Sequence, residues 1–281
     1  MKSLISLFLF TSLIANGQSK DSIHYGNNKQ AGHIAEIRGI KMYYETYGSG
    51  YPLLIIHGNS GSIGDFSDQI PYFSSKYKVI LADSRDHGNT LDTLHMSDSL
   101  SYEMMSDDYA ALLQYLKIDS AYVLGWSDGG INGILLAIRH PEKVKKLVAL
   151  GANLWPDTTA INPFILSVFK MQYLLMQKRK PGIENSVILR HYKLILTEPN
   201  IKAQALSGVK CPTLVIGGDH DAIQVPHTVL IAQSIPNSNL WIVPNAGHGL
   251  LIQYKDKFNT EVDDFFKRPF KKVQGFDLFK N

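Results

Sequence analysis

Cysteine is nearly absent from this sequence, since Cys211 is the only one in 281 residues. A single cysteine excludes an intramolecular disulfide, and it excludes zinc sites built from several thiolates. Cys211 precedes Pro212 at the start of an apolar run, where a buried, chemically inert thiol is the ordinary interpretation. The residues around it match no pattern typical of a catalytic cysteine.

An excess of charge of one sign is also lacking. The formal net charge is only +3, so nucleic acid is not expected as a partner. The basic clusters Lys178–Lys180 and Lys267–Lys272 are short and typical of a solvated surface. After the N-terminus no run is long and apolar enough to cross a bilayer, so stable membrane insertion is not expected. The oligomeric state leaves no signal in the sequence.

One apolar run stands out, at the N-terminus. Lys2 precedes an apolar stretch from Leu4 to Ala15, and small or polar residues follow at 16–19. This layout is typical of a secretory signal peptide over 1–17, and it predicts a periplasmic or secreted protein. A buried N-terminal helix is the alternative, but the run lacks an amphipathic period. Residues 18–32 are polar and predict a flexible leader.

The remaining residues, 33–281, alternate short apolar runs with longer amphipathic segments. A content of 44% hydrophobic residues is enough for one large α/β domain. The apolar runs predict strands buried on both faces, at 42–47, 53–56, 79–82, 121–124, 147–150, 213–216 and 240–243. The amphipathic segments predict helices at 65–75, 102–116, 130–140, 227–235 and 256–266. This alternation predicts a mainly parallel sheet flanked by helices.

The alternation is interrupted between about 154 and 206. This insertion has no convincing buried strand but has helical stretches near 163–177 and 186–196, which predicts a small helical lid over the strand ends. Its larger side chains, Trp155 and Met171 among them, either line a pocket or pack against the main domain.

A glycine-flanked serine lies between a predicted strand and a predicted helix. The segment Gly125-Trp126-Ser127-Asp128-Gly129 matches the pattern G-x-S-x-G of a nucleophile turn. A serine at the tip of such a sharp turn needs small neighbours two residues away, and Gly125 and Gly129 meet that need. The helix N-terminus directs N–H groups and partial positive charge at the serine. We therefore interpret Ser127 as a nucleophile rather than as part of a plain glycine-rich turn.

A serine nucleophile needs a base to accept its proton and an acid to orient that base. His248 lies in a glycine-flanked loop after the last predicted strand, where the order Ser, Asp, His places the base. A histidine that merely caps the next helix is the alternative. Asp219 and Asp221 both follow the strand at 213–216. Asp221 is preferred because it lies deeper in the loop, and Asp219 is then expected to make turn hydrogen bonds.

Attack on a carbonyl also requires donors for the oxyanion that develops. The backbone N–H of Asp128 is the first expected donor, because it follows the nucleophile. The second is the N–H of Asn59, in the loop after the strand at 53–56. His57, in the same loop, is expected to brace it by hydrogen bonding.

These residues together resemble the α/β-hydrolase superfamily along nearly the whole mature chain. The matching blocks are 57–58, 83–88, 125–130, 218–221, 225–226 and 247–248. The resemblance supports the triad and supports Asp221 over Asp219. Residues 125–131 and 151–153 are similar to the valacyclovir hydrolase (biphenyl hydrolase-like) group, which hydrolyses α-amino acid esters. In that group an acidic residue after the nucleophile holds the substrate ammonium, and Asp128 stands at that position.

Two features depart from these families, and two more allow another interpretation. Asp86 stands where the superfamily usually has glycine, and the insertion does not clearly match. The loop 57–59 is also similar to haloalkane dehalogenases, but their nucleophile is an aspartate and Ser127 argues against that chemistry. Asp128 also has an ordinary explanation, because the helix dipole favours a carboxylate in the first turn of a helix.

The sequence therefore predicts a serine hydrolase that cleaves small-molecule carboxylic esters through an acyl-enzyme. Its triad is Ser127, His248 and Asp221, and no metal or cofactor is expected. Candidate substrate contacts are Asp128, Trp126 and Trp155. An acyltransferase, a C–C or amide hydrolase and a non-catalytic ligand-binding homologue are the alternatives that stay open.

Overall fold

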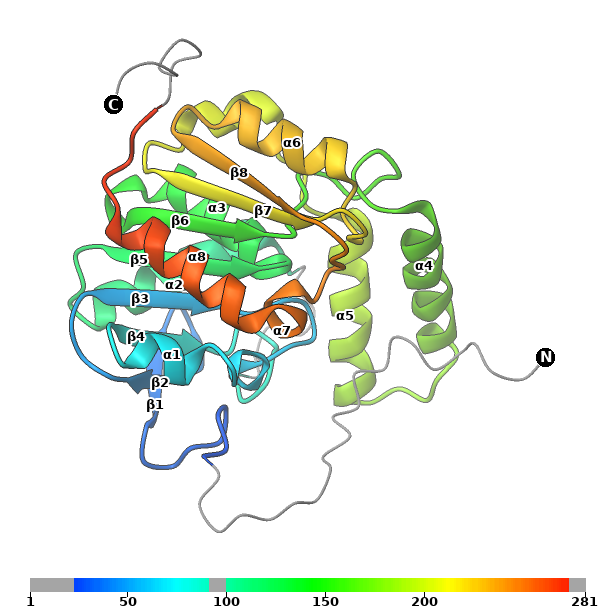
Figure 1. Cartoon of the computed structure of the whole chain (residues 1–281). Coiled ribbons are helices and arrows are strands. Elements are labelled where there is room, and N and C mark those ends of the chain that lie inside the picture. The colour runs from blue at the N-terminus through cyan, green and yellow to red at the C-terminus, as the bar shows by residue number, and fades with distance from the viewer. Residues whose placement is uncertain (1–22, 91–99, 273–281) are drawn as a thin grey trace.

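The structure, a computed structural model of the chain, describes residues 23–90 and 100–272. The predicted signal peptide lies outside the described residues. Eight strands form one sheet in the order β1-β2-β4-β3-β5-β6-β7-β8 (Figure 1). The strands are β1 (Gly32–Ile37), β2 (Ile40–Tyr47), β3 (Pro52–Ile56), β4 (Lys78–Ala82), β5 (Ala121–Trp126), β6 (Val144–Leu150), β7 (Thr213–Gly218) and β8 (Ser238–Val243). Of these eight strands, β2 alone runs against the direction of the others, so the predicted mainly parallel sheet is confirmed.

Helices cover both faces of the sheet. The helices are η1 (Ile63–Phe66), α1 (Ile70–Ser74), α2 (Tyr102–Tyr115), α3 (Asp128–Arg139), η2 (Pro141–Lys143), α4 (Pro163–Gln177), α5 (Ile183–Thr197), η3 (Ala203–Gly208), α6 (Val225–Ser234), α7 (Leu250–Gln253) and α8 (Lys255–Lys267). One apolar core joins α2, α3 and α6 to one face. A second core joins α1, α7 and α8 to the other face, where α1 and α8 lie in front of the strands in Figure 1. Strands buried from both sides explain the nearly continuous Val, Ile and Leu runs.

Two elements differ from the expectation. The predicted set of strands omitted β1, whose exposed and buried residues alternate as on a half-covered edge strand. The two-residue loop Arg38-Gly39 joins it to β2, with positive φ at both positions as in a tight hairpin turn. The helix predicted at 65–75 is instead split into η1 and α1, because Pro71 has no N–H to continue a helical ladder and lies in the first turn of α1.

The predicted flexible leader also differs over its described part, residues 23–32. Glu45 is fully buried, and its carboxylate accepts hydrogen bonds from the backbone N–H groups of Gly26 (3.0 Å) and Asn28 (2.9 Å). The hydroxyl groups of Tyr43 and Tyr47 donate to the same carboxylate, each at 2.7 Å. A buried carboxylate requires such donors, which is why the segment is held against the sheet.

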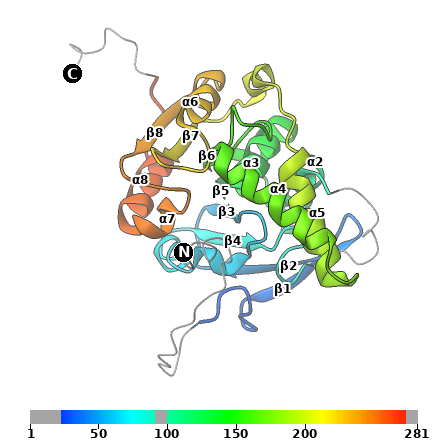
Figure 2. The ribbon, with the colours of Figure 1, turned by 90° about the vertical axis from the view of Figure 1, so that its right-hand side faces the viewer.

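The 154–206 insertion lies between β6 and β7 and contains α4 and α5. Both helices lie beyond the carboxyl ends of the strands, with α5 nearer to the sheet (Figures 1 and 2). The helical stretches predicted there are confirmed in type, and α4 has the predicted bounds. That the insertion acts as a lid stays a prediction.

Asp86, the residue that replaces the usual glycine, attaches this insertion to the main domain. Its φ of 61° lies in the left-handed region that glycine tolerates best. Its buried carboxylate forms an ion pair with Arg190 of α5, and its backbone carbonyl accepts a hydrogen bond from Nε2 of His191 at 2.9 Å. Glycine would adopt this positive φ without strain, but only the aspartate supplies a carboxylate that links the main domain to α5.

This link makes a prediction for stability. Asp86→Ala removes the carboxylate partner of Arg190, so the free energy of unfolding in urea should fall by about 3 kcal/mol or more. Asp86→Gly also lacks the carboxylate but relieves the left-handed backbone, so it should recover only about 1 kcal/mol of that loss. If Asp86→Gly were as stable as the wild type, the ion pair would not stabilise the fold.

Candidate active site

Ser127 lies at a sharp turn between β5 and α3, with φ of 57° and ψ of −119°. Its N–H donates to the carbonyl of Leu150 at 2.8 Å, which ties the turn to the neighbouring strand. A Cβ atom at Gly125 would lie 2.0 Å from the carbonyl oxygen of Gly129, and one at Gly129 would lie 2.0 Å from that of Ile56. Both flanking positions thus require glycine, which is the physical basis of the motif.

The structure brings together the three residues predicted as a triad. Nε2 of His248 lies 2.9 Å from Oγ of Ser127, and Nδ1 lies 2.6 Å from Oδ1 of Asp221. The three follow β5, β7 and β8, whose carboxyl ends lie along one edge of the sheet. Asp219 lies outside this chain of hydrogen bonds and accepts from the N–H of Ala246 at 3.1 Å, as expected of a turn residue.

Electrostatics set the proton positions in this chain. Burial raises the pKa of Asp221, but the His248 imidazole and the N–H groups of Ile223 and Gly218 outweigh burial and lower it. Burial lowers the pKa of His248, but the Asp221 carboxylate outweighs burial and raises it above 6.5. Because an ionised carboxylate only accepts, Nδ1 carries a proton and Nε2 is left to accept one from Ser127.

The loop after β3 passes directly beside the nucleophile. A Cβ atom at Gly58 would lie 3.2 Å from that of Ser127. His57 braces this loop, since its Nε2 accepts from the N–H of Ser84 at 2.9 Å and its Nδ1 donates to the carbonyl of Gly58 at 2.7 Å. Within the described part of the chain, the N–H groups of Asn59 and Asp128 donate no hydrogen bond. Both predicted oxyanion donors are therefore unengaged.

Asp128 is a buried carboxylate next to the nucleophile, with 5% of its surface exposed. Nδ2 of Asn59 donates to it at 2.9 Å, and the Tyr102 hydroxyl also hydrogen-bonds to it. Burial raises its pKa to about 6, and these hydrogen bonds oppose that rise. Among the described residues no Lys or Arg side chain forms an ion pair with it. The site thus contains a desolvated negative charge without a strong cationic partner.

The two tryptophans predicted as substrate contacts have other neighbours. Nε1 of Trp126 donates to the carbonyl of His248 at 2.8 Å, and its ring lies beside the imidazole, so it braces the loop of the base. Trp155 donates to Thr159 and lies edge-on to His227. It also borders a hollow of about 390 Å³ whose other lining residues are 200–204, away from the triad. Their contact with substrate stays a prediction.

A chain of polar contacts joins α5 to Asp128, and the sequence did not predict it. The Ser60 hydroxyl oxygen lies 3.0 Å from Nδ1 of His191 and 3.0 Å from Oδ1 of Asn59, and its one proton is available to either acceptor. Asn59 in turn donates to Asp128. Burial lowers the pKa of His191 to about 4, so its ring is neutral near pH 7. No spacing rule links a histidine of the insertion to a loop 131 residues earlier in the chain.

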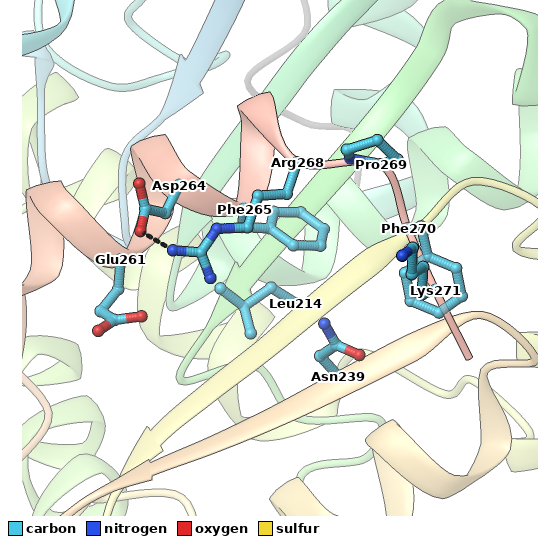
Figure 3. Close-up of a pocket in the computed structure, with 9 residues that line it drawn as sticks. All are labelled: Leu214, Asn239, Glu261, Asp264, Phe265, Arg268, Pro269, Phe270 and Lys271. Carbon is cyan, nitrogen blue, oxygen red and sulfur yellow. Dashed lines mark hydrogen bonds and ion pairs between the residues drawn. The ribbon is translucent and has the colours of Figure 1, made fainter. Parts of the chain in front are cut away.

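A hollow of about 320 Å³ lies between β7, β8 and the end of α8 (Figure 3). It contains the ion pair between Arg268 and Asp264, and none of the triad residues lines it. Among the described residues, no group of three or more His, Cys, Asp or Glu side chains is arranged to hold a metal ion.

Comparison with known proteins agrees with this geometry. A family model described as "alpha/beta hydrolase fold" matches residues 51–178. The chain is 28% identical over 263 residues to Serine hydrolase BPHL of Homo sapiens, with 86% of this chain and 88% of that protein covered. It is 26% identical to Putative carbamate hydrolase RutD of Caulobacter sp. (strain K31), with 80% and 95% covered.

Solved structures extend the likeness. A hydrolase from Pseudomonas aeruginosa PA01 superimposes with a TM-score of 0.72 at 20% identity, over 86% of this chain and 100% of that one. The segment that matches the family model contains both the loop after β3 and the nucleophile turn. The chain thus has the α/β-hydrolase fold, and the proteins it is similar to are hydrolases.

Proposed function

We propose that this protein is a serine hydrolase that cleaves carboxylic esters through an acyl-enzyme. The continuous chain of hydrogen bonds from Asp221 through His248 to Ser127 carries this proposal. The unengaged N–H groups beside Ser127 and the similarity to Serine hydrolase BPHL support it.

The mechanism follows from the positions of the protons. Oγ of Ser127 attacks the acyl carbon of the ester while Nε2 of His248 takes the hydroxyl proton. The N–H groups of Asn59 and Asp128 stabilise the oxyanion of the tetrahedral intermediate. Its collapse expels the alcohol, which receives the proton from His248. Water, deprotonated by His248, then attacks the acyl-enzyme and releases the carboxylic acid, and the proton returns to Ser127.

An ester is the substrate that this set of groups serves most directly. An alcohol leaves more easily than an amine, so an ester demands less proton transfer from His248 to the leaving group. Other relatives of this chain are named as a carbamate hydrolase and as hydrolases of 2-hydroxy-6-oxononadienedioate. A substrate screen should therefore test amide-like and C–C substrates beside the esters.

A specific observation favours α-amino acid esters within this class. Asp128 is buried beside Ser127 with a raised pKa and no Lys or Arg ion pair among the described residues. A substrate ammonium would supply the missing positive charge and lower that pKa. Such a charge pair would hold the amine next to the acyl carbon that Ser127 attacks.

The triad predicts the effect of removing the nucleophile. Ser127→Ala should lower kcat for p-nitrophenyl acetate by at least about 10⁴-fold, because it removes the nucleophile. A fluorophosphonate should add once to the wild type, at Ser127, and not to the variant, as read by intact mass. The exposed Ser207→Ala variant is the matched control and should behave as the wild type. Undiminished turnover by Ser127→Ala would exclude this mechanism.

The pH profile makes the second prediction. His248 must be neutral to act as the base, and its pKa is raised above 6.5. The acid limb of kcat/KM should therefore rise with pH and have its midpoint above 6.5. Asp221→Asn removes the charge that raises this pKa and leaves the burial that lowers it, so the midpoint should move to lower pH. An unmoved midpoint would show that the two groups are not coupled.

The third prediction separates the two interpretations of Asp128. Asp128→Asn keeps the size of the side chain and a hydrogen-bonding oxygen but removes the negative charge. If the carboxylate binds an ammonium, kcat/KM should fall at least about 10-fold more for an α-amino acid ester than for the matching ester without the amine. Equal losses for both esters would leave Asp128 with a structural role at the start of α3.

A further inference from the structure

The outward face of α4 exposes an unusual number of large apolar side chains. Four large apolar side chains on it are exposed: Phe164 by 67%, Leu174 by 57%, Met171 by 49% and Leu175 by 47%. Their positions recur at helical intervals, so they form one stripe. α4 stands on the outside of the insertion (Figures 1 and 2). The opposite side of the helix buries Leu166 and Met176.

Positive charge accompanies this stripe. Lys170 lies within α4, and Lys178, Arg179 and Lys180 follow its last turn, all of them exposed. No acidic residue occurs between 163 and 180. In the described part of the chain, none of these four cations forms an ion pair. An exposed apolar stripe with unpaired cations and no anion is the pattern of a helix that lies in a lipid interface.

We propose that α4 docks on an anionic lipid surface. The apolar stripe enters the boundary between head groups and acyl chains, and the four cations face anionic head groups. A second copy of the chain fits this surface less well. It would present the same stripe with the same four cations, so that neither copy supplies an anion to the other.

Docking through α4 would also determine how the triad is oriented relative to the membrane. α4 lies beyond the carboxyl ends of the strands (Figure 1). Ser127 lies at the same edge, because it directly follows the carboxyl end of β5. A protein that rests on α4 therefore directs this edge of its sheet toward the membrane. This inference does not depend on the proposed ester chemistry, because it concerns a surface separate from the triad.

Co-sedimentation of the whole protein with vesicles tests the proposal. Vesicles of phosphatidylcholine and phosphatidylglycerol should bind it at least about 10-fold more tightly than phosphatidylcholine alone, and salt should weaken this binding by screening the charges. Leu174→Glu with Leu175→Glu should lower the affinity at least about 10-fold. Replacement of Lys178, Arg179 and Lys180 by glutamine should lower it by about 5-fold per charge.

The controls separate docking from misfolding and from self-association. Ile34→Glu changes an apolar residue of similar exposure on β1 and should leave vesicle binding unchanged. The thermal unfolding midpoint of each α4 variant should match that of the wild type. Equal binding to both vesicle types, or full binding by the Leu174 and Leu175 variant, would overturn the proposal. So would a wild-type dimer that this variant dissociates and that binds no vesicle.

Discussion

Asp221 is a buried carboxylate, and its 2.6 Å hydrogen bond to His248 sets the proton positions of the groups around Ser127. The His248 imidazole, together with the backbone N–H groups of Ile223 and Gly218, keeps Asp221 ionised despite its burial. The ionised carboxylate then fixes a proton on Nδ1 of His248, which leaves Nε2 free to accept from Ser127. None of these residues is adjacent in sequence. Only the parallel strands β5 to β8, which end along one edge of the sheet, bring them within hydrogen-bonding distance.

A second chain of contacts joins this edge of the sheet to the insertion. Asp86 holds α5 through Arg190 and His191, and His191 reaches Asn59 through Ser60. Asn59 supplies both a candidate oxyanion donor and a hydrogen bond to Asp128. The position of α5 is thus coupled to the loop beside the nucleophile. The left-handed backbone of Asp86 is compatible with this role, since strained residues persist where the surroundings hold them in place.

Much of this arrangement could be predicted from the sequence, because its signals are local. The nucleophile turn between strand and helix identified Ser127, and the order of residues after later strands pointed to Asp221 and His248. Two features could not be predicted, because they depend on contacts between residues far apart in the sequence. The segment 23–32 is held by Glu45, and nothing in its polar composition indicates that a buried carboxylate lies nearby. His191 is one of ten histidines, and only the tertiary structure distinguishes it. Trp126 was predicted to contact substrate from its place in the nucleophile motif, but its indole N–H donates to the loop that contains His248.

Ester cleavage by this triad requires a covalent intermediate at Ser127, and mass spectrometry of the acylated protein tests for that intermediate most directly. The enzyme is mixed with p-nitrophenyl acetate, quenched with acid before deacylation is complete, and digested. We expect one acetyl group per chain, on the peptide that contains Ser127, and its disappearance at the rate of substrate turnover. Turnover with the acetyl group on another residue, or with the Ser127 peptide unmodified throughout, would contradict the account.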